Sequence, residues 1–167
     1  MNGHGAGPVL RAATRADVPL LERWDEDPEV RVSGDDDWWD WDAELAVPAP
    51  WVEHLIAELD GRPLGFVQLL DAVAEPTGYW GDVAPGSWAI DIWIGAAADR
   101  GRGHGTRMLM AAVERCVVDH GATEVLVDPL AANVRAHRFY RRAGFLPIGS
   151  RRLGGDDCLV HRYAPGG

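Results

Sequence analysis

An apolar strand, a glycine-rich loop and an amphipathic helix follow one another in the middle of the chain, and this order constrains the fold more than any other feature. The predicted strand covers residues 88–94, and the helix runs to about His120 with apolar residues at helical spacing. Another predicted strand, residues 124–128, follows the helix directly. Strands and helices in such an order predict an α/β protein, in which helices pack on the faces of a mixed sheet.

The rest of the chain supplies further elements for this sheet. Asp60-Gly61 is a strong hairpin signal between two strands. Thr14 followed by Asp17 is typical of a helix start. The other predicted strands are 9–12, 52–59, 64–70, 145–152 and 158–163, and the other predicted helices lie near 39–45 and at 133–143. No linker divides the 167 residues, so we expect one domain, 1–167, with flexible tails at 1–8 and 164–167.

The loop before the central helix, the glycine loop (residues 100–105), has the composition of an anion site. Its glycines are Gly101, Gly103 and Gly105. Glycine lets the backbone turn tightly and approach a ligand, and the free N–H groups at the helix start favour an anion. Arg100 and Arg102 add positive charge, so the pattern predicts a diphosphate cradle, with a plain turn as the alternative. It lacks the ending of a P-loop, and Met108 stands where the dinucleotide-binding fingerprint needs a glycine.

The charge of the chain indicates a cationic partner. The net charge is −10, and nine carboxylates lie between Asp25 and Asp42 beside a single basic residue, Arg31. Such a field repels nucleic acid and anionic lipid. The same segment holds three indoles, Trp38, Trp39 and Trp41. Aromatic faces beside carboxylates suit a hydroxylated polycation with rings, whereas a solvated acidic loop is the alternative.

Other classes of protein and of chemistry find no support in the sequence. Cys116 and Cys158 form no disulfide framework, and the six histidines are scattered without ligand spacing, so no metal site is expected. No apolar run approaches the roughly 20 residues of a membrane-spanning helix. The first residues lack the pattern of a secretory signal. We therefore expect a cytoplasmic protein with no membrane partner.

Two spaced motifs resemble those of the GNAT superfamily of N-acetyltransferases. Arg100-x-x-Gly103-x-Gly105 is similar to its pyrophosphate motif, and Asn133-x-x-Ala136-x-x-x-Tyr140-x-x-x-Gly144-Phe145 is similar to its second hallmark. The resemblance implies the GNAT fold, a sheet of six to seven strands flanked by helices, and acetyl-CoA as cosubstrate. It assigns cofactor binding to Ile92, Trp93, Ile94, Arg100, Gly101, Arg102, Gly103, His104, Gly105, Thr106, Asn133, Ala136 and Tyr140. Tyr140 would protonate the departing thiolate, with aromatic packing as its alternative role, and Asn133 would contact cofactor, cap its helix, or both.

Asp91 is the only carboxylate in an otherwise apolar strand. A buried acid is costly unless it is paired or has a function. Asp91 could accept a proton from an attacking ammonium group or anchor that group electrostatically. The alternative is a structural aspartate bonded to backbone.

The chain also resembles the aminoglycoside 6′-N-acetyltransferases. The similar stretches are Gly78-Tyr79-Trp80, Pro85-Gly86, Ile90-Asp91, Val127-Asp128-Pro129 and Asn133 through Phe145. This resemblance implies substrate contacts from Trp38, Trp39, Asp40, Trp80, Asp82, Asp91, Asp128, Asp156 and Asp157. Related enzymes often place an acid before the Pro-Gly pair, where this chain has Ala84, and Asp82 could compensate. Hairpin-turn roles for Asp156 and Asp157, and a helix-entry role for Asp128, are the alternatives.

Other functions stay open at this level. A GNAT acyltransferase for a siderophore hydroxylysine, a polyamine or a protein N-terminus would carry similar cofactor motifs. A non-catalytic module that binds coenzyme A or an aminoglycoside is a hypothesis from a different class. The sequence leaves the choice between a monomer and a homodimer undecided.

Overall fold

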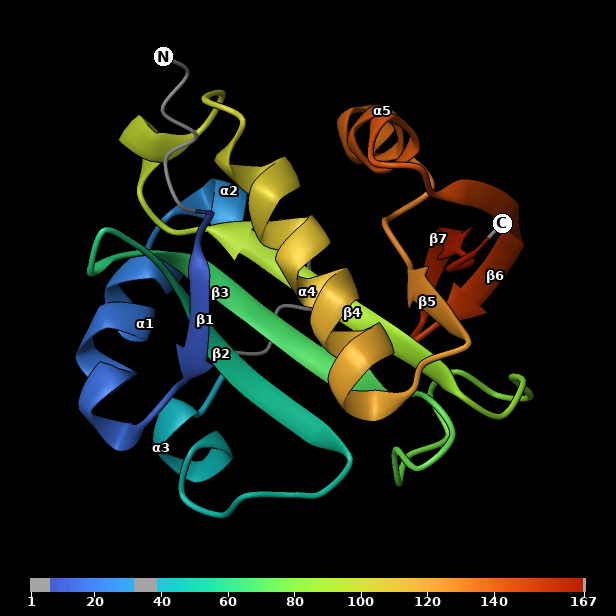
Figure 1. The fold of residues 1–167 in the computed structure, drawn as a ribbon, viewed down its shortest axis with the longest axis horizontal. Coiled ribbons are helices and arrows are strands. Elements are labelled where there is room, and N and C mark those ends of the chain that lie inside the picture. The colour runs from blue at the N-terminus through green and yellow to red at the C-terminus, as the bar shows by residue number, and fades with distance from the viewer. Residues whose placement is uncertain (1–6, 32–38, 167) are drawn as a thin grey trace.

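The computed structural model describes residues 7–31 and 39–166, in which seven strands form one mixed sheet (Figure 1). The strands are β1 (Val9–Ala12), β2 (Val52–Leu59), β3 (Arg62–Asp71), β4 (Ser87–Ile94), β5 (Glu124–Val127), β6 (Leu146–Leu153) and β7 (Asp156–Tyr163). The helices are α1 (Val18–Asp25), α2 (Pro28–Arg31), α3 (Trp41–Glu44), α4 (His104–His120) and α5 (Val134–Arg142), with 3-10 turns η1 (Arg15–Asp17) and η2 (Ala97–Asp99). Trp38 and residues 1–6 and 167 of the predicted tails lie outside the described residues.

The strands run in the order β1-β2-β3-β4-β5-β7-β6, and all neighbours are antiparallel except β4 and β5. The predicted mixed sheet of six to seven strands is confirmed. Asp60 and Gly61 turn between β2 and β3 with φ of 51° and 75°, the left-handed region that a two-residue hairpin needs. Thr14 begins the first helical segment, where its backbone N–H donates to the Asp17 carboxylate at 2.8 Å.

Two apolar layers hold the sheet between helices. Figure 1 shows α4 running across the near face of the sheet. The buried side of α4, including Met108 and Leu109, packs on Val67, Ile90 and Val125. On the opposite face, α1 and α3 pack their buried side chains over β2 and β3. The residues of that second layer include Leu21, Trp24, Trp41, Ile56 and Phe66. The alternating strand pattern therefore divides its residues between the two layers.

The only parallel pair of the described sheet is short, and its two strands separate. β4 pairs with β5 through three residues, of which Ala89 opposite Leu126 is the last. β4 continues to Ile94, whereas β5 ends at Val127. Beyond Ala89, β4 therefore keeps its ladder to β3 but none to β5. The divergence of β4 and β5 opens a gap in the sheet next to α4 and α5 (Figure 1).

Of the strand ends that differ from the prediction, two bear on predicted site residues. β7 begins at Asp156, two residues earlier than expected, because the turn consists of Gly154 and Gly155 with φ of 56° and 91°. Asp156 and Asp157 are therefore strand residues, and the alternative that made them the turn itself is wrong. β5 stops at Val127, which leaves Asp128 directly after the strand.

Candidate active site

The glycine loop forms an uncapped helix start. Gly101 and Gly103 have φ of 71° and 79°, a conformation that costs glycine little. Gly103 is the N-cap of α4, and no side chain caps the helix there. The N–H groups of the first turn therefore point out of the helix without partners inside it, and they can donate to an anion. The predicted diphosphate cradle requires such a helix start, and diphosphate binding itself stays a prediction.

Gly105 lets the start of α4 approach α5. A Cβ atom at Gly105 would lie 3.4 Å from the ring of Phe139, which is close contact. His104 next to it is half-buried, and its Nδ1 lies 3.2 Å from the Arg107 guanidinium. Thr106 is exposed on the first turn. The start of α4 thus lies close to the second half of α5.

Arg100 has a different partner from the one the sequence predicted. Its guanidinium donates to Asp27 at 2.8 Å and to Glu29 at 3.0 Å, and it reaches the carbonyl of Gly95 at 3.3 Å. This side chain is only 17% exposed. Arg100 thus ties the glycine loop to Asp27 and to Glu29 of α2, which neutralise its charge, and its role in cofactor binding stays a prediction. Arg102 is exposed and keeps its charge available.

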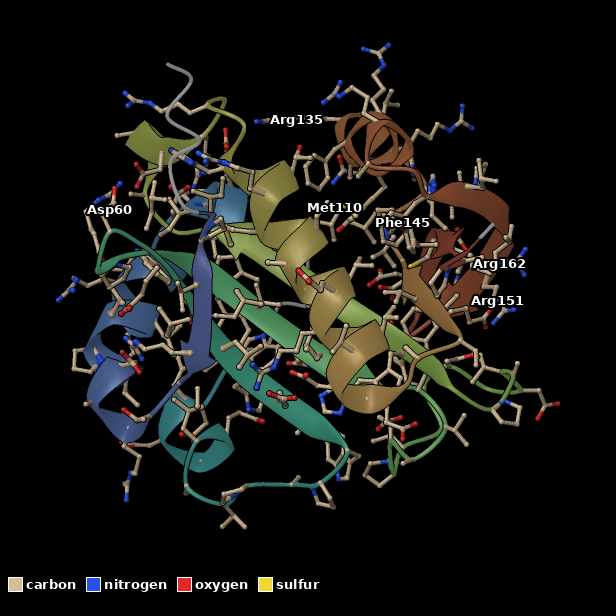
Figure 2. All side chains as sticks on the ribbon, viewed as in Figure 1. Asp60, Met110, Arg135, Phe145, Arg151 and Arg162 are labelled. Atoms are coloured by element: carbon tan, nitrogen blue, oxygen red, sulfur yellow. The ribbon has the colours of Figure 1, made fainter. Side chains whose placement is uncertain are left out.

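A second arginine completes this contact region. Arg135, in the first turn of α5, lies 3.9 Å from Glu29. Figure 2 shows its side chain extending from α5 toward the amino end of α4. Arg135 is 78% exposed and was not among the predicted site residues, although it stands inside the second motif. Glu29 thus lies near cationic groups from both sides of the gap.

Asp91 and Asp128, here called the acid pair, face each other across the gap. Ala89 is level with Leu126 in the parallel register, and two further residues along each strand bring Asp91 level with Asp128 on the same face. Two carboxyls in one partly dry space disfavour each other's charged form. Asp91 is exposed and not buried as expected, but desolvation by the surrounding protein, together with the charge of Asp128, raises its pKa to about 7. Burial also raises the pKa of Asp128.

Tyr140 meets the acid pair from the other side of the sheet. Its ring packs among the residues under α4 and α5, 5.7 Å from Phe145 and 6.2 Å from His161 between centroids. Burial and the charges of Asp91 and Asp128 raise its pKa, so the hydroxyl keeps its proton at neutral pH. No described residue makes a hydrogen bond with that hydroxyl. The structure therefore brings a proton donor and two acids to one gap.

The second motif also has a structural function. The side chain of Asn133 accepts a hydrogen bond from the backbone N–H of Ala136 at 3.1 Å, which caps α5. The capping role of Asn133 is confirmed. Ile92 and Ile94 pack partly buried against the α4 layer, and the β4 edge that carries them faces the gap.

An aromatic wall, defined as Trp39, Trp41, Phe66 and Trp93, stands on the face that carries Asp91. Trp39 stacks on Trp41 at 4.8 Å between centroids, and Trp93 stacks on Phe66 at 4.5 Å. Trp41 is buried and donates to Asp25 at 2.5 Å, whereas Trp39 is 37% exposed. Trp39 therefore offers a ring face to a ligand. Trp93, expected to bind cofactor, has a side chain that builds this wall.

The remaining predicted substrate residues fall into three environments. Trp80 is only 4% exposed and belongs to the core, so it supports the site from below instead of lining it. Asp40 caps α3 by accepting from the N–H of Ala43 at 3.1 Å. Asp82 is exposed in the loop after β3. Asp157 pairs with Arg152 at 3.2 Å on the β6–β7 hairpin, and its neighbour Asp156 is exposed.

Tyr79 and Gln68 are site residues that the sequence analysis did not single out. The Tyr79 hydroxyl donates to Asp128 at 2.6 Å. Gln68 on β3 is the pairing partner of Asp91 on β4, and its Oε1 is buried without a partner among the described residues. Tyr79 stood in a stretch that already carried the family resemblance, whereas nothing in the sequence pairs Gln68 with Asp91.

None of the described helices is long and apolar enough to cross a membrane. No group of three or more histidine, cysteine or acidic side chains in residues 7–31 and 39–166 could hold a metal ion. Cys116 and Cys158 are both buried free thiols, and burial raises the pKa of Cys116 to about 12.

Comparison with known proteins agrees with the motifs. A model of the GNAT acetyltransferase domain matches residues 13–153, so the chain belongs to the GNAT acetyltransferase family. It is 30% identical over 151 residues to the aminoglycoside N(6′)-acetyltransferase type 1 proteins of Klebsiella pneumoniae and Serratia marcescens, covering 82% of this chain and 73% of theirs. A kanamycin resistance protein of Rhizobium radiobacter is 39% identical over 61 residues, covering 36% of this chain and 56% of that protein.

Solved structures give the same relationship in three dimensions. The aminoglycoside acetyltransferase AAC(6′)-Ib in complex with coenzyme A has a TM-score of 0.85 and 28% identity, over 95% of each chain. Its complex with coenzyme A and kanamycin has a TM-score of 0.80 and 26% identity, again over 95% of each chain. The expected GNAT fold is thereby confirmed over nearly the whole chain.

Proposed function

We propose that this protein transfers the acetyl group of acetyl-CoA to the 6′-amine of an aminoglycoside antibiotic and so confers resistance. The observation that carries the proposal is the meeting of the acid pair with Tyr140 across the β4–β5 gap. An amine acceptor needs an acid nearby to hold and deprotonate its ammonium form, and a thioester donor needs a proton source for its thiolate. Asp91 and Asp128 would meet the first need and Tyr140 the second, from opposite sides of the β4–β5 gap.

The cosubstrate would supply an activated acetyl group as a thioester. The N–H groups of the first α4 turn, at His104, Gly105 and Thr106, would hold its diphosphate, with Arg102 adding charge. The exposed β4 edge from Ile92 to Ile94 would bind the pantetheine arm and support the carbonyl oxygen as it gains negative charge. Asn133 and Ala136, at the start of α5, would border the gap between β4 and β5.

The residues of the gap would then move the protons. Asp91 would take a proton from the bound ammonium group, which leaves a neutral amine able to attack the thioester carbonyl. Tyr140 would give its proton to the sulfur as the carbon–sulfur bond breaks. A raised pKa serves Asp91 because a base is most useful when its pKa lies near the working pH.

The substrate side would recognise rings and positive charge. Trp39 would stack on a sugar ring, supported by Trp41 and Trp93. Other cationic groups of the acceptor would be attracted by the nearby carboxylates. Those carboxylates are Asp40, Asp82, Asp128, Asp156 and Asp157. Trp80 would act from the core, by fixing the loop that carries Tyr79.

The test is release of coenzyme A by the purified full-length protein in the presence of acetyl-CoA. Kanamycin, tobramycin and sisomicin would be compared with spermidine, lysine, N-hydroxylysine and a peptide amine. We expect turnover with the aminoglycosides alone, and NMR of the product showing the acetyl group on the 6′-nitrogen. Turnover only with another amine would overturn the aminoglycoside assignment, and binding without turnover would overturn the enzymatic one.

A further inference from the structure

Tyr79 is held in a fixed position next to the acid pair. Its ring lies against the β6–β7 hairpin, where a Cβ atom at Gly154 would come within 3.0 Å of it. On another side it meets the buried ring of Trp80 edge to face, at 5.6 Å between centroids and 75° between planes. These two contacts aim the hydroxyl at Asp128, to which it donates at 2.6 Å.

This hydrogen bond acts on one member of a coupled pair. A donated hydrogen bond stabilises the charged form of a carboxyl. Asp128 receives such a bond from Tyr79, whereas no described side chain donates one to Asp91. Two neighbouring carboxyls titrate together, so the state of one determines how readily the other takes a proton. The asymmetry of the hydrogen bonding therefore decides which acid holds the shared proton.

The other groups around the pair do not remove this asymmetry. Tyr140 reaches it from α5 with a raised pKa and is neutral. From β7, burial and the charges of Asp128, Asp156 and Asp157 raise the pKa of Cys158 to about 11, so its thiol is neutral as well. On β3, the residue paired with Asp91 is the uncharged Gln68. On β2, the residue paired with Gln68 is His54, whose pKa is lowered by burial.

We propose that Tyr79 is the positioning residue that keeps Asp128 ionised, so that Asp91 is the acid that accepts and releases the proton of the acceptor amine. The proposal rests on the proposed acetyl transfer. Asp128 then anchors the ammonium group by its charge. The N–H bond of that group breaks as an O–H bond forms on Asp91, which afterwards releases the proton to water. Tyr79 itself touches neither the cosubstrate nor the acetyl group.

The test is a carbon-13 NMR titration of the aspartate carboxyls in the full-length protein without substrate. Tyr79→Phe removes the hydroxyl and keeps the ring, and Asp91→Asn and Asp128→Asn assign the two signals. In the wild type we expect the step near pH 7 on Asp91. In Tyr79→Phe the titration of Asp128 should move up by about 1 pH unit, because its charged form loses a donor. An unchanged Asp128 curve would overturn the proposal.

A second background isolates the route through Asp128. In Asp128→Asn, the additional change Tyr79→Phe should leave the Asp91 titration unaltered, since the hydroxyl no longer has a carboxylate to stabilise. If Tyr79→Phe changes the Asp91 titration equally in the wild type and in Asp128→Asn, the proposal is contradicted. Tyr163→Phe is the control for loss of a tyrosine hydroxyl elsewhere and should change neither curve.

Kinetics then connect the titration to turnover. For Tyr79→Phe we expect the acid limb of kcat/KM for the aminoglycoside to move to higher pH, with an unchanged KM for acetyl-CoA. If kcat/KM of Tyr79→Phe falls by the same factor at every pH, Tyr79 only shapes the site, and the proposal is overturned. Since the titration needs no substrate, failure of the aminoglycoside panel and failure of the Tyr79 proposal are distinguishable results.

Discussion

The guanidinium of Arg100 lies 2.8 Å from the carboxylate of Asp27, and this contact joins the glycine loop to the segment that follows α1. Glu29 adds a second carboxylate at 3.0 Å. The first residue of the motif Arg100-x-x-Gly103-x-Gly105 thus holds the loop in place, and the backbone N–H groups at the uncapped start of α4 remain available to an anion.

Arg100→Ala should lower the free energy of unfolding by about 1–3 kcal/mol, because Asp27 and Glu29 lose a charged partner. Chemical denaturation measures this effect, and calorimetry should show weaker binding of coenzyme A by the loosened loop. Arg102→Ala is the matched control: its side chain is exposed, so the stability should stay within about 0.5 kcal/mol. Equal stability of the two variants would contradict the stabilising contact of Arg100 with Asp27 and Glu29.

Gly95→Ala should destabilise the protein by about 1–3 kcal/mol through overpacking. A Cβ atom there would lie 1.9 Å from the ring of Trp24, which packs flat against this position. Thermal and chemical unfolding check the prediction. Gly7→Ala, where a Cβ atom would meet nothing within 4 Å, should leave stability unchanged. If Gly95→Ala leaves the stability unchanged, α1 with Trp24 is free to move away from Gly95.

Asp91→Asn should reduce kcat/KM for the aminoglycoside by about 10²- to 10⁴-fold, the usual contribution of a general base. The Kd for coenzyme A should not change, because the cradle at α4 is untouched. Asp60→Asn in the β2–β3 turn is the control and should leave kcat/KM unchanged. It removes a carboxylate far from Asp91 in the chain, and asparagine also tolerates the left-handed φ of 51°. Full activity of Asp91→Asn would exclude this acid from proton transfer.

Tyr140→Phe should lower kcat by roughly 10²-fold, since the thiolate loses its proton donor. The folded state should be preserved, because the ring contacts with Phe145 and His161 do not involve the hydroxyl. Steady-state rates and thermal unfolding, measured on the same preparation, separate the two effects. An unaltered kcat would assign thiolate protonation to water or to the acceptor.

His161 should make the protein lose stability in mild acid. Its Nε2 bonds His137 Nδ1 at 3.0 Å, its Nδ1 is buried without a partner among the described residues, and burial lowers its pKa from 6.5 to about 4. The unfolded chain takes up this proton near pH 6.5, whereas the folded protein resists it. The contribution of neutral His161 is therefore complete above about pH 6.5 and is lost as the pH falls toward 4.

Chemical unfolding at a series of pH values tests that window. The free energy of unfolding should decline more steeply between pH 6.5 and 4 in the wild type than in His161→Gln. Glutamine can still donate to His137 but cannot take up a proton. Parallel curves for the two proteins would show that other groups govern the acid sensitivity.

The sequence predicted the elements and the cofactor end of the site well, for physical reasons that operate locally. Hydrophobic periodicity and turn residues identified β1 and β2 to the residue, and they placed the ends of the other predicted strands and helices within a few residues, whereas α2 was not predicted. The glycine loop was recognisable because its conformation needs glycine at particular positions. The anion-binding start of α4 is a property of one short segment, and a short segment is what sequence patterns describe.

The partners of individual side chains could not be obtained in this way. Arg100 reads as a phosphate ligand until α2, over 70 positions earlier in the chain, brings Asp27 and Glu29 against it. Trp80 reads as a substrate-facing indole, yet it is buried beneath the loop that contains it. Asp40 reads as one more acid of a cationic site, although its carboxylate caps α3.

The sequence by itself determined the family, the cradle for an anion and the identity of the two acids and the tyrosine. Only the tertiary structure decided that these groups meet. Asp91, Asp128 and Tyr140 come from β4, the end of β5 and α5, and they converge because the parallel pairing of β4 with β5 stops after Ala89. Where two strands separate depends on the packing of α4, α5 and the whole sheet. For that reason the position of the gap is a property of the fold and of no single segment.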